Sequence, residues 1–258
     1  MRNNWVREKL KAGEPTIGAL MGLGSPSVAE LLAHAGYDWL VVETEHSAVE
    51  PGQVEHMLMG MSGTNVIPLI RPVSADPLVI QKALDIGGMG VFVPMVRTAE
   101  EAAAIVSATR YPPEGIRGFG PLRASQYTFD YPDYLASANE NTLVSLILET
   151  KEAMDNLDDI MSVPGLDAMY LGLFDLCLSM GLNPIHMPFP QIDEAIDVAV
   201  KTGKKHGVAV GIGVGSLDEL QQRLDQGMTF CVYGTDYMML GGAARTGIEG
   251  FRKMSGRD

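Results

Sequence analysis

The stretch LVSLILE, residues 143–149, and the stretch AMYLGLF, residues 168–174, decide the fold class of this chain. Each is about one β-strand long and almost continuously apolar, which is typical of a buried parallel strand rather than a half-exposed one. Each also gives way to an acid, because Glu149 ends the first run and Asp175 directly follows the second. In an α/β barrel the C-terminal strand ends carry the chemistry, so these two acids are the first candidates for a functional site.

The same alternation of apolar runs and helix-period segments extends over the whole chain. The runs that we expect to be strands are Thr16–Leu23, Trp39–Glu45, Asn65–Pro72, Gly90–Val96, Leu143–Glu149, Ala168–Phe174, Val208–Val214 and Phe230–Asp236. Helix patterns follow them, and the last helix is expected over Tyr237–Met254. Eight strand–helix pairs in 258 residues predict one (β/α)8 TIM barrel spanning residues 1–258. A doubly wound open sheet is the alternative, but Gly22–Ser27 only faintly resembles the glycine-rich phosphate turn that it requires.

The connection over residues 111–141 is much longer than the others and carries two arginines and four tyrosines. Long connections in compact domains are usually functional or covering segments. We therefore expect this loop to lie near the mouth of the barrel, where the strands end.

The composition excludes several classes of partner and location. The formal net charge is −13 and the sequence pI is near 4.8, so nucleic acid and anionic membrane surfaces are poor partners. The two cysteines are too few for a disulfide framework, which favours the cytoplasm. The charged N-terminus lacks the apolar region of a signal peptide, and no run is long and apolar enough to span a bilayer.

In the predicted barrel, polar residues from several strand ends meet at one face. They are Glu43, Glu45 and His46 after the second strand, Arg71 after the third, Glu149 after the fifth, and Gly172 and Asp175 after the sixth. Two carboxylates brought together repel each other unless a cation lies between them. Glu149 and Asp175 would suit Mg²⁺ or Mn²⁺, with water and substrate oxygens completing the coordination. The alternative is that each acid only caps the helix that follows it.

Arg71 and His46 also have two interpretations each. Arg71 emerges from an apolar strand, and its permanent charge must meet an anion, which is either a substrate or a structural partner such as Glu43 or Glu45. His46 is a candidate acid or base, although a lone histidine at a strand end is more often a loop or core residue.

At these residues the chain resembles the HpcH/HpaI aldolases, metal-dependent aldolases of 2-oxo acids such as 4-hydroxy-2-oxoheptanedioate aldolase and 2-dehydro-3-deoxyglucarate aldolase. The segments that carry the resemblance are YDWLVVETEHSAVE (Tyr37–Glu50), VIPLIRP (Val66–Pro72), ALDIGGMGVFVPMV (Ala83–Val96), RYPPEGIRGFGP (Arg110–Pro121), LETKEAMDNLDDI (Leu148–Ile160) and YLGLFDLCLSMG (Tyr170–Gly181). The resemblance implies a TIM barrel of the phosphoenolpyruvate/pyruvate-binding type. It also implies a homohexamer in which the last helix packs on a neighbouring subunit.

The resemblance further implies a role for each matching residue. Glu149 and Asp175 correspond to the ligands of a divalent cation, which is Mg²⁺, Mn²⁺ or Co²⁺ in this family. His46 corresponds to the catalytic histidine, and Asp85 to the acid that orients it in a dyad. Arg71 corresponds to the arginine that contacts the substrate carbonyl oxygen. The backbone of Gly172, Leu173 and Phe174 corresponds to the amides that hold the substrate carboxylate.

Three positions depart from the family pattern. Glu43 stands where an aspartate is frequent, Ile147 where a glutamine is common, and Leu173-Phe174 where the family commonly has Pro-Ala. Phe174 in place of a small residue is expected to narrow the floor of the pocket. These changes spare the metal ligands and the arginine, so they bear on substrate choice.

The expected activity is a metal-dependent aldol cleavage or formation of 4-hydroxy-2-oxo acids, with pyruvate or oxaloacetate and an aldehyde as small-molecule partners. The alternatives are an oxaloacetate decarboxylase or acyl-CoA lyase that uses the same chemistry, and a catalytically silent barrel that binds a 2-oxo acid. A Schiff-base aldolase would need a lysine of depressed pKa, and neither Lys82 nor Lys151 interrupts an apolar strand.

Overall fold

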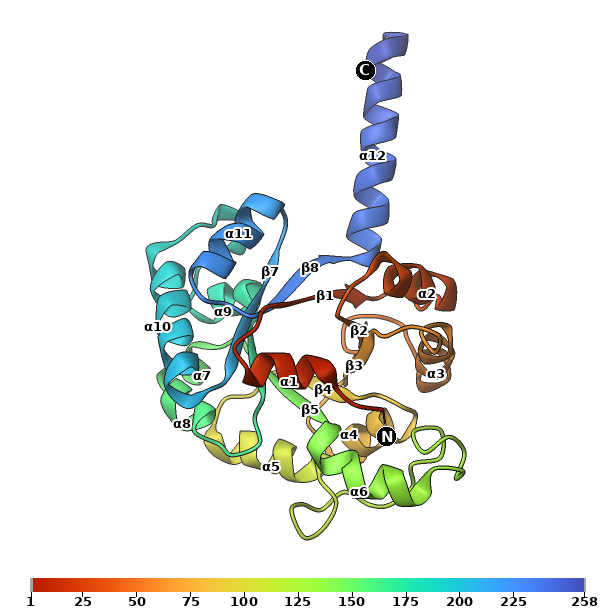
Figure 1. Ribbon diagram of the computed structural model, residues 1–258. Helices are drawn as coiled ribbons and strands as arrows, with labels where there is room; N and C mark the ends of the chain where they lie inside the picture. The colour runs from red at the N-terminus through yellow and green to blue at the C-terminus, as the bar shows by residue number, and fades with distance from the viewer. Residues whose placement is uncertain (1, 258) are drawn as a thin grey trace.

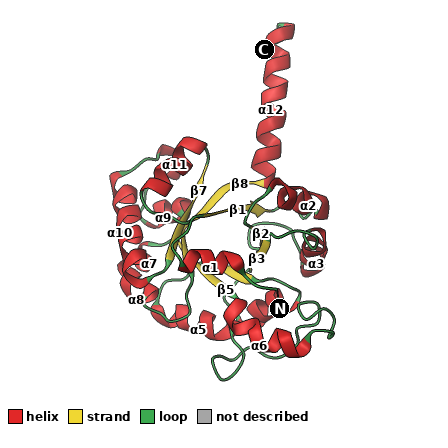
Figure 2. Ribbon diagram, viewed as in Figure 1, coloured by secondary structure: helices red, strands yellow, loops and turns green. Residues whose placement is uncertain are grey.

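The computed structural model describes residues 2–257 and shows eight parallel strands closed into a barrel in chain order. Figures 1 and 2 show the strands at the centre with helices around them. The strands are β1 Thr16–Met21, β2 Trp39–Glu43, β3 Ile67–Arg71, β4 Gly90–Val93, β5 Leu143–Leu148, β6 Ala168–Leu171, β7 Ala209–Val214 and β8 Phe230–Thr235. The predicted (β/α)8 barrel is therefore confirmed.

Helices follow every strand, as the sequence pattern predicts. The helices are α1 Trp5–Lys11, α2 Pro26–Ala35, α3 Pro51–Gly60, α4 Pro77–Asp85, α5 Ala99–Thr109, α6 Tyr131–Asn141, α7 Lys151–Asp155, α8 Leu157–Met161, α9 Leu173–Ser179, the 3₁₀ turn η1 Pro184–His186, α10 Pro190–His206, α11 Leu217–Asp225 and α12 Asp236–Ser255. Several begin at a side-chain cap, such as Thr98, whose hydroxyl accepts the N–H of Glu101 at the start of α5.

Most strands end one to three residues earlier than their apolar runs. The sixth run continues to Phe174, but β6 ends at Leu171 and α9 begins at Leu173. The last pair of this ladder joins Leu148 to Leu171. Apolar residues continue past the strand ends because they cover the mouth of the barrel, so hydropathy alone overestimates strand length.

Aromatic rings fill the inside of the barrel. Trp39 and Phe230 stack with ring centroids 4.1 Å apart, and Phe92 lies 5.0 Å from Tyr170. Gly18 makes this packing possible, because a Cβ there would lie 2.2 Å from the Trp39 ring. The interior is a packed core, so ligands can reach only its ends.

Helix α1 lies across the end of the barrel where the strands begin (Figure 1). Its buried residues Val6 and Leu10 pack with the aromatic interior. This helix therefore covers the centre of that end, and the mouth of the barrel lies at the opposite end, where the strands finish.

The long connection between α5 and β5 lies at the N-terminal end of the barrel, which corrects the expectation of a position near the mouth. It is a loop over residues 111–130 followed by α6. Arg123 in this loop donates to the carbonyl of Ile86, in the segment that precedes β4. A connection from a helix to the next strand must lie where strands begin, so its direction along the chain fixes its end of the barrel.

Helix α12 projects away from the barrel (Figure 1). Of its residues, Asp236 alone is buried. Its exposed apolar side chains are Tyr237, Met238, Leu240, Ile248, Phe251 and Met254. None of the helices within residues 2–257 has the length and hydropathy that a bilayer-spanning segment requires.

Candidate active site

The barrel brings the predicted site residues of four strands to its C-terminal end. Glu43 and Arg71 are the last residues of β2 and β3 and are paired across the ladder. Glu149 follows the last residue of β5, and Asp175 lies in the first turn of α9 after β6. Parallel strands thus place these four side chains at one face, as the spacing predicts.

Arg71 is the centre of a cluster of carboxylates. One guanidinium nitrogen lies 3.0 Å from Glu43 Oε2. The other lies 2.5 Å from Glu45 Oε2 and 3.9 Å from Glu149 Oε2. Arg71 is therefore an ion-pair partner of Glu43 and Glu45, as one of its two interpretations predicts. Its Nε is buried without a hydrogen bond to any described residue, so one donor remains for a further acceptor.

Glu149 is held in place by an unusual backbone conformation. The N–H of Met95 donates to Glu149 Oε1 at 2.8 Å, and Met95 has a left-handed φ of 60°. A non-glycine residue in this region is strained, and such strain is concentrated at functional sites. Gly172 is also needed, because a Cβ there would lie 2.7 Å from Glu149 Oε2. Met95 thus fixes Oε1, and the missing side chain of Gly172 leaves room for Oε2 on the Arg71 side.

The carboxylates of this cluster disfavour one another's charge. Burial raises the pKa of Glu149, and the nearby Asp175 and Glu45 raise it further against the opposing effects of Met95 and Arg71. Burial likewise raises the pKa of Glu45, with Arg71 as the main opposing influence. A cation among these groups would favour their ionised forms.

The donor chemistry fits a hard divalent cation. Glu149 and Asp175 offer carboxylate oxygens only, and Mg²⁺ commonly binds one or two carboxylates while keeping several waters. Residues 2–257 contain no group of three or more His, Cys, Asp and Glu side chains arranged to hold a metal. A site built here would therefore depend on water and substrate oxygens for the remaining ligands.

The predicted histidine lies beside this cluster. His46 Nε2 is 3.4 Å from Glu45 Oε2, and 65% of its side chain is exposed. The His46 backbone N–H donates to Glu43 Oε1 at 3.1 Å, which fixes the chain at this point. An exposed imidazole beside a carboxylate can accept or release a proton at the mouth of the barrel.

The structure does not bring Asp85 to His46. Asp85 is the last residue of α4, so it lies at the N-terminal end of the barrel, opposite to His46. Its Oδ1 accepts a hydrogen bond of 2.7 Å from Arg117, a fully buried side chain that also donates to the Tyr134 hydroxyl at 3.0 Å. The dyad expected from the resemblance is therefore not formed within the described chain.

The backbone of Gly172, Leu173 and Phe174 forms the N-terminal end of α9. Gly172 is the N-cap and provides no side-chain hydrogen bond to the first turn. Its own N–H donates to the carbonyl of Leu148 at 3.1 Å, so the N–H groups of Leu173 and Phe174 are the ones that an anion could use. Leu173 and Phe174 also line a cavity of ≈ 570 Å³ at the barrel mouth. Phe174 is 62% exposed at the edge of this cavity. Ile147 is buried in the barrel interior.

A backbone donor of the site and the arginine that holds Asp85 at the opposite end of the barrel were not identified from the sequence. Met95 acts through its backbone N–H. Its left-handed φ could not be predicted, because a methionine does not favour that conformation. Arg117 lies in the RGFGP segment of the long connection, and only its charge in an otherwise apolar and glycine-rich stretch could have marked it.

The chain is similar in sequence to known proteins. The sequence profile of the HpcH/HpaI aldolase/citrate lyase family matches residues 17–242. A 4-hydroxy-2-oxo-heptane-1,7-dioate aldolase of Escherichia coli (strain ATCC 8739) is 40% identical over 93% of this chain and 92% of its own length. The enzyme of the same name from Salmonella newport (strain SL254) is 39% identical over 98% of this chain and 97% of its own.

The fold matches solved structures of the same kind. A HpcH/HpaI aldolase/citrate lyase family protein from Burkholderia cenocepacia J2315 superposes with a TM-score of 0.91 and 32% identity, covering 97% of this chain and 100% of the other. The citrate synthase SbnG superposes with a TM-score of 0.87 and 25% identity, covering 97% and 98%.

Proposed function

Because the chain belongs to the HpcH/HpaI aldolase/citrate lyase family, we propose that it is a divalent-metal-dependent carbon–carbon lyase that cleaves or forms 4-hydroxy-2-oxo acids. The observation that carries the proposal is the cluster of Glu45 and Glu149 around Arg71 at the barrel mouth, with Asp175 close enough to raise the pKa of Glu149. The relatives' names suggest that the substrate is 4-hydroxy-2-oxo-heptane-1,7-dioate or a similar acid.

In this proposal Glu149 and Asp175 hold the metal, which is Mg²⁺, Mn²⁺ or Co²⁺. When bound, the metal would supply Lewis-acid polarisation of the 2-oxo group. The backbone of Gly172, Leu173 and Phe174 binds the substrate carboxylate at the start of α9, with the N–H groups of Leu173 and Phe174 as donors. These contacts orient pyruvate, or the pyruvate half of the longer acid, against the cluster.

Arg71 then stabilises the charge that develops during the reaction. Its free Nε–H and its guanidinium charge lie where the 2-oxo oxygen becomes negative as the carbon–carbon bond breaks. Glu43 and Glu45 hold the guanidinium in place on two sides. His46 accepts the proton of the 4-hydroxyl in the cleavage direction and returns it in the synthetic direction.

A Schiff-base mechanism has little support. Lys82 lies on α4 and is exposed. Lys151 is exposed and forms a 2.6 Å ion pair with Asp155. A Schiff-base lysine requires a desolvated pocket, which neither side chain occupies.

One experiment distinguishes the proposed lyase from a catalytically silent barrel. In heavy water with added Mn²⁺, we expect the enzyme to exchange the C3 protons of pyruvate for deuterium, because the same charge stabilisation assists loss of a C3 proton. The exchange is followed by proton NMR, with the Arg71→Ala variant as the control. A wild-type rate no faster than the control would favour a barrel that binds 2-oxo acids without catalysis. If exchange occurs but pyruvate is not released from 4-hydroxy-2-oxo acids, an oxaloacetate decarboxylase or acyl-CoA lyase would be favoured.

We also propose that the chain acts as a homo-oligomer, a hexamer by resemblance, in the cytoplasm. The projecting α12 exposes apolar side chains along much of its length, among them Leu240, Ile248 and Phe251. A second copy of the chain could cover them. Cys177 and Cys231 are buried and unpaired, which suits a reducing compartment.

An oligomer also offers a way for Asp85 to reach a catalytic histidine. Within one chain Asp85 and His46 lie at opposite ends of the barrel, so a dyad could form only between two copies. Arg117 holds Asp85 from the buried side through Oδ1. We therefore propose that Asp85, if it acts on His46, acts on the His46 of a second subunit.

Mixing two inactive variants tests this proposal. His46→Ala and Asp85→Asn should each have low turnover, and subunit exchange between them should restore about a quarter of wild-type activity, because random assembly gives that share of intact sites. Pyruvate release is the assay, and sedimentation velocity checks that both variants assemble. Mixing His46→Ala with Arg71→Ala is the control, since both residues lie at the mouth of one barrel. No restoration, or full activity of Asp85→Asn alone, would exclude the shared dyad.

A further inference from the structure

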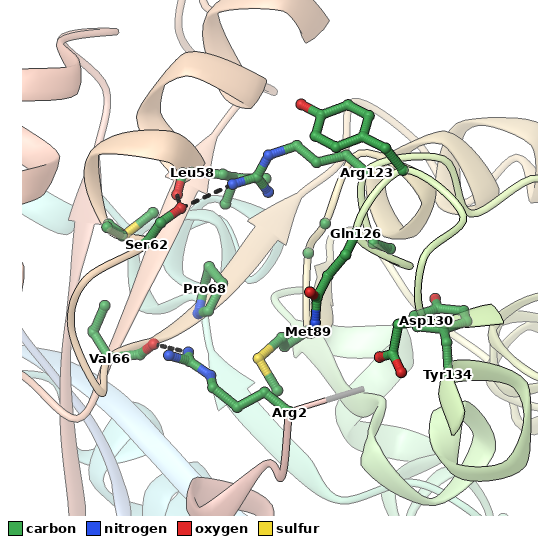
Figure 3. A pocket seen from close by; sticks show the side chains of 15 residues that line it. Arg2, Leu58, Ser62, Val66, Pro68, Met89, Arg123, Gln126, Asp130 and Tyr134 are labelled. Carbon is green, nitrogen blue, oxygen red and sulfur yellow. Dashed lines mark hydrogen bonds between the residues drawn. The ribbon is translucent and has the colours of Figure 1, made fainter. Parts of the chain in front are cut away.

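A second cavity lies at the N-terminal end of the barrel, opposite to the candidate active site. It has a volume of ≈ 420 Å³ and is bounded by α3, by the segments that precede β3 and β4, and by the long connection. Figure 3 shows Arg2 and Arg123 extending toward it from opposite sides. Leu58, Met61 and Met89 form an apolar part of its wall.

Among the described residues, the hydrogen-bond partners of Arg2 at this cavity are neutral. Its guanidinium donates to the carbonyl of Thr64 at 2.6 Å and to the carbonyl of Val66. The residue as a whole is exposed, but the bond to Val66 is partly buried. Burial lowers the pKa of Arg2, as expected for a cation that is partly desolvated without a carboxylate partner.

Arg123, on the other side of the cavity, also donates to neutral groups. Its Nη1 donates to the carbonyl of Ile86 at 3.1 Å, and its Nη2 donates to the hydroxyl of Ser62 at 3.1 Å. Gly87 gives it room, because a Cβ there would lie 2.3 Å from Nη1, and the φ of Gly87 is +111°. The backbone thus leaves space for this guanidinium, and no carboxylate of residues 2–257 forms an ion pair with it.

The loop above the cavity has a strained backbone. Gln126, Tyr127 and Thr128 are three consecutive non-glycine residues with left-handed φ values of 53°, 55° and 80°. Hydrogen bonds hold this run, from the N–H of Tyr127 to the carbonyl of Leu122 at 2.7 Å and from the N–H of Thr128 to Ser125 Oγ at 3.3 Å. Gln126 and Tyr127 line the cavity. Strain of this kind persists where the surroundings impose it, and it is most frequent at ligand clamps and active sites.

The charges of the lining favour an anion. The two guanidiniums face one carboxylate, that of Asp130, which has an interaction of its own. A net positive cavity is unusual in a chain with a formal net charge of −13. Arginine donors match the paired oxygens of carboxylate and phosphate groups.

We propose that this cavity is a second binding site, which takes a small anion with a carboxylate or phosphate group between Arg2 and Arg123. The amide of Gln126 and the hydroxyl of Ser62 add neutral hydrogen-bonding groups beside the two cations. The carbon portion of the ligand packs on Met61 and Met89. None of its lining residues belongs to the cluster at the barrel mouth of the same chain, so the proposal does not rest on the proposed aldolase chemistry.

Isothermal titration of the full chain with inorganic phosphate, and separately with succinate, tests the proposal and distinguishes the two kinds of anion. We expect saturable binding of at least one probe. Arg123→Gln and Arg2→Gln should each weaken it about 10-fold or more, since each removes charge-assisted hydrogen bonds. Arg2 is exposed and close to the chain terminus, so Arg2→Gln keeps the test decisive if Arg123→Gln fails to fold.

Two control variants separate this cavity from other anion sites. Lys201→Gln removes one exposed positive charge of α10, outside the cavity, and should leave binding unchanged. Arg71→Ala should also leave it unchanged, even if that variant has lost activity. The proposal is wrong if neither probe binds saturably, if binding survives Arg2→Gln and Arg123→Gln together, or if it is lost in Arg71→Ala.

Discussion

Replacing Arg71 by alanine should remove most of the turnover while leaving the barrel folded. The change deletes the cation that lies within 4 Å of Glu43, Glu45 and Glu149. It also deletes the donor that faces the developing oxyanion. We expect a loss of ~10²–10³-fold in kcat, the magnitude found when one such donor is removed from other enzymes. Pyruvate release from 4-hydroxy-2-oxo-heptane-1,7-dioate measures it.

Two controls make this result specific. Circular dichroism should show an intact barrel, because the Arg71 side chain lies at the mouth and not in the aromatic interior. Arg71→Lys keeps the charge but loses the planar fork that bridges Glu43 and Glu45, so it should be intermediate in kcat. An Arg71→Ala enzyme that folds and turns over at the wild-type rate would remove Arg71 from the mechanism.

The fold could be predicted because each apolar run had to be buried. Eight such runs, separated by segments of helical period, leave few arrangements other than a closed parallel sheet. The strand ends were less predictable, as Leu173 and Phe174 show. These residues are apolar because they cover the barrel mouth at the start of α9, and hydropathy does not separate that role from a strand.

The site could be predicted in part. Glu149 and Arg71 were identifiable because charged residues at the ends of apolar strands converge on one face. The contribution of Met95 was not, because it depends on a left-handed φ and a backbone N–H. The roles of His46 and the metal ligands rest on resemblance and chemistry, and they stay predictions.

Asp85 shows that a matching motif does not by itself tell at which end of the barrel a residue lies. The motif that contains it is in the expected order, but the residue ends α4 and lies at the end of the barrel where strands begin. The expectation that the long connection lies near the mouth rested on its length and likewise left out the direction of the chain. In both cases the direction of the chain, rather than its residue types, decides the position.

The second large effect should follow from removing the metal. Exhaustive chelation is expected to abolish pyruvate release, and added Mn²⁺, Mg²⁺ or Co²⁺ should restore it, because the carboxylates of Glu149 and Asp175 are proposed to act only through a bound cation. Glu149→Gln should be inactive and unresponsive to added metal. Glu152→Gln, which removes an exposed acid of α7, should behave as wild type.

Metal dependence of pyruvate release is therefore the most direct test of the account. The assay follows cleavage of 4-hydroxy-2-oxo-heptane-1,7-dioate by the chelated wild-type enzyme before and after titration with Mn²⁺. The account predicts that turnover is absent at first and rises to saturation at about one metal ion per chain, since each barrel has one pair of proposed ligands. Full turnover by the exhaustively chelated enzyme would contradict it.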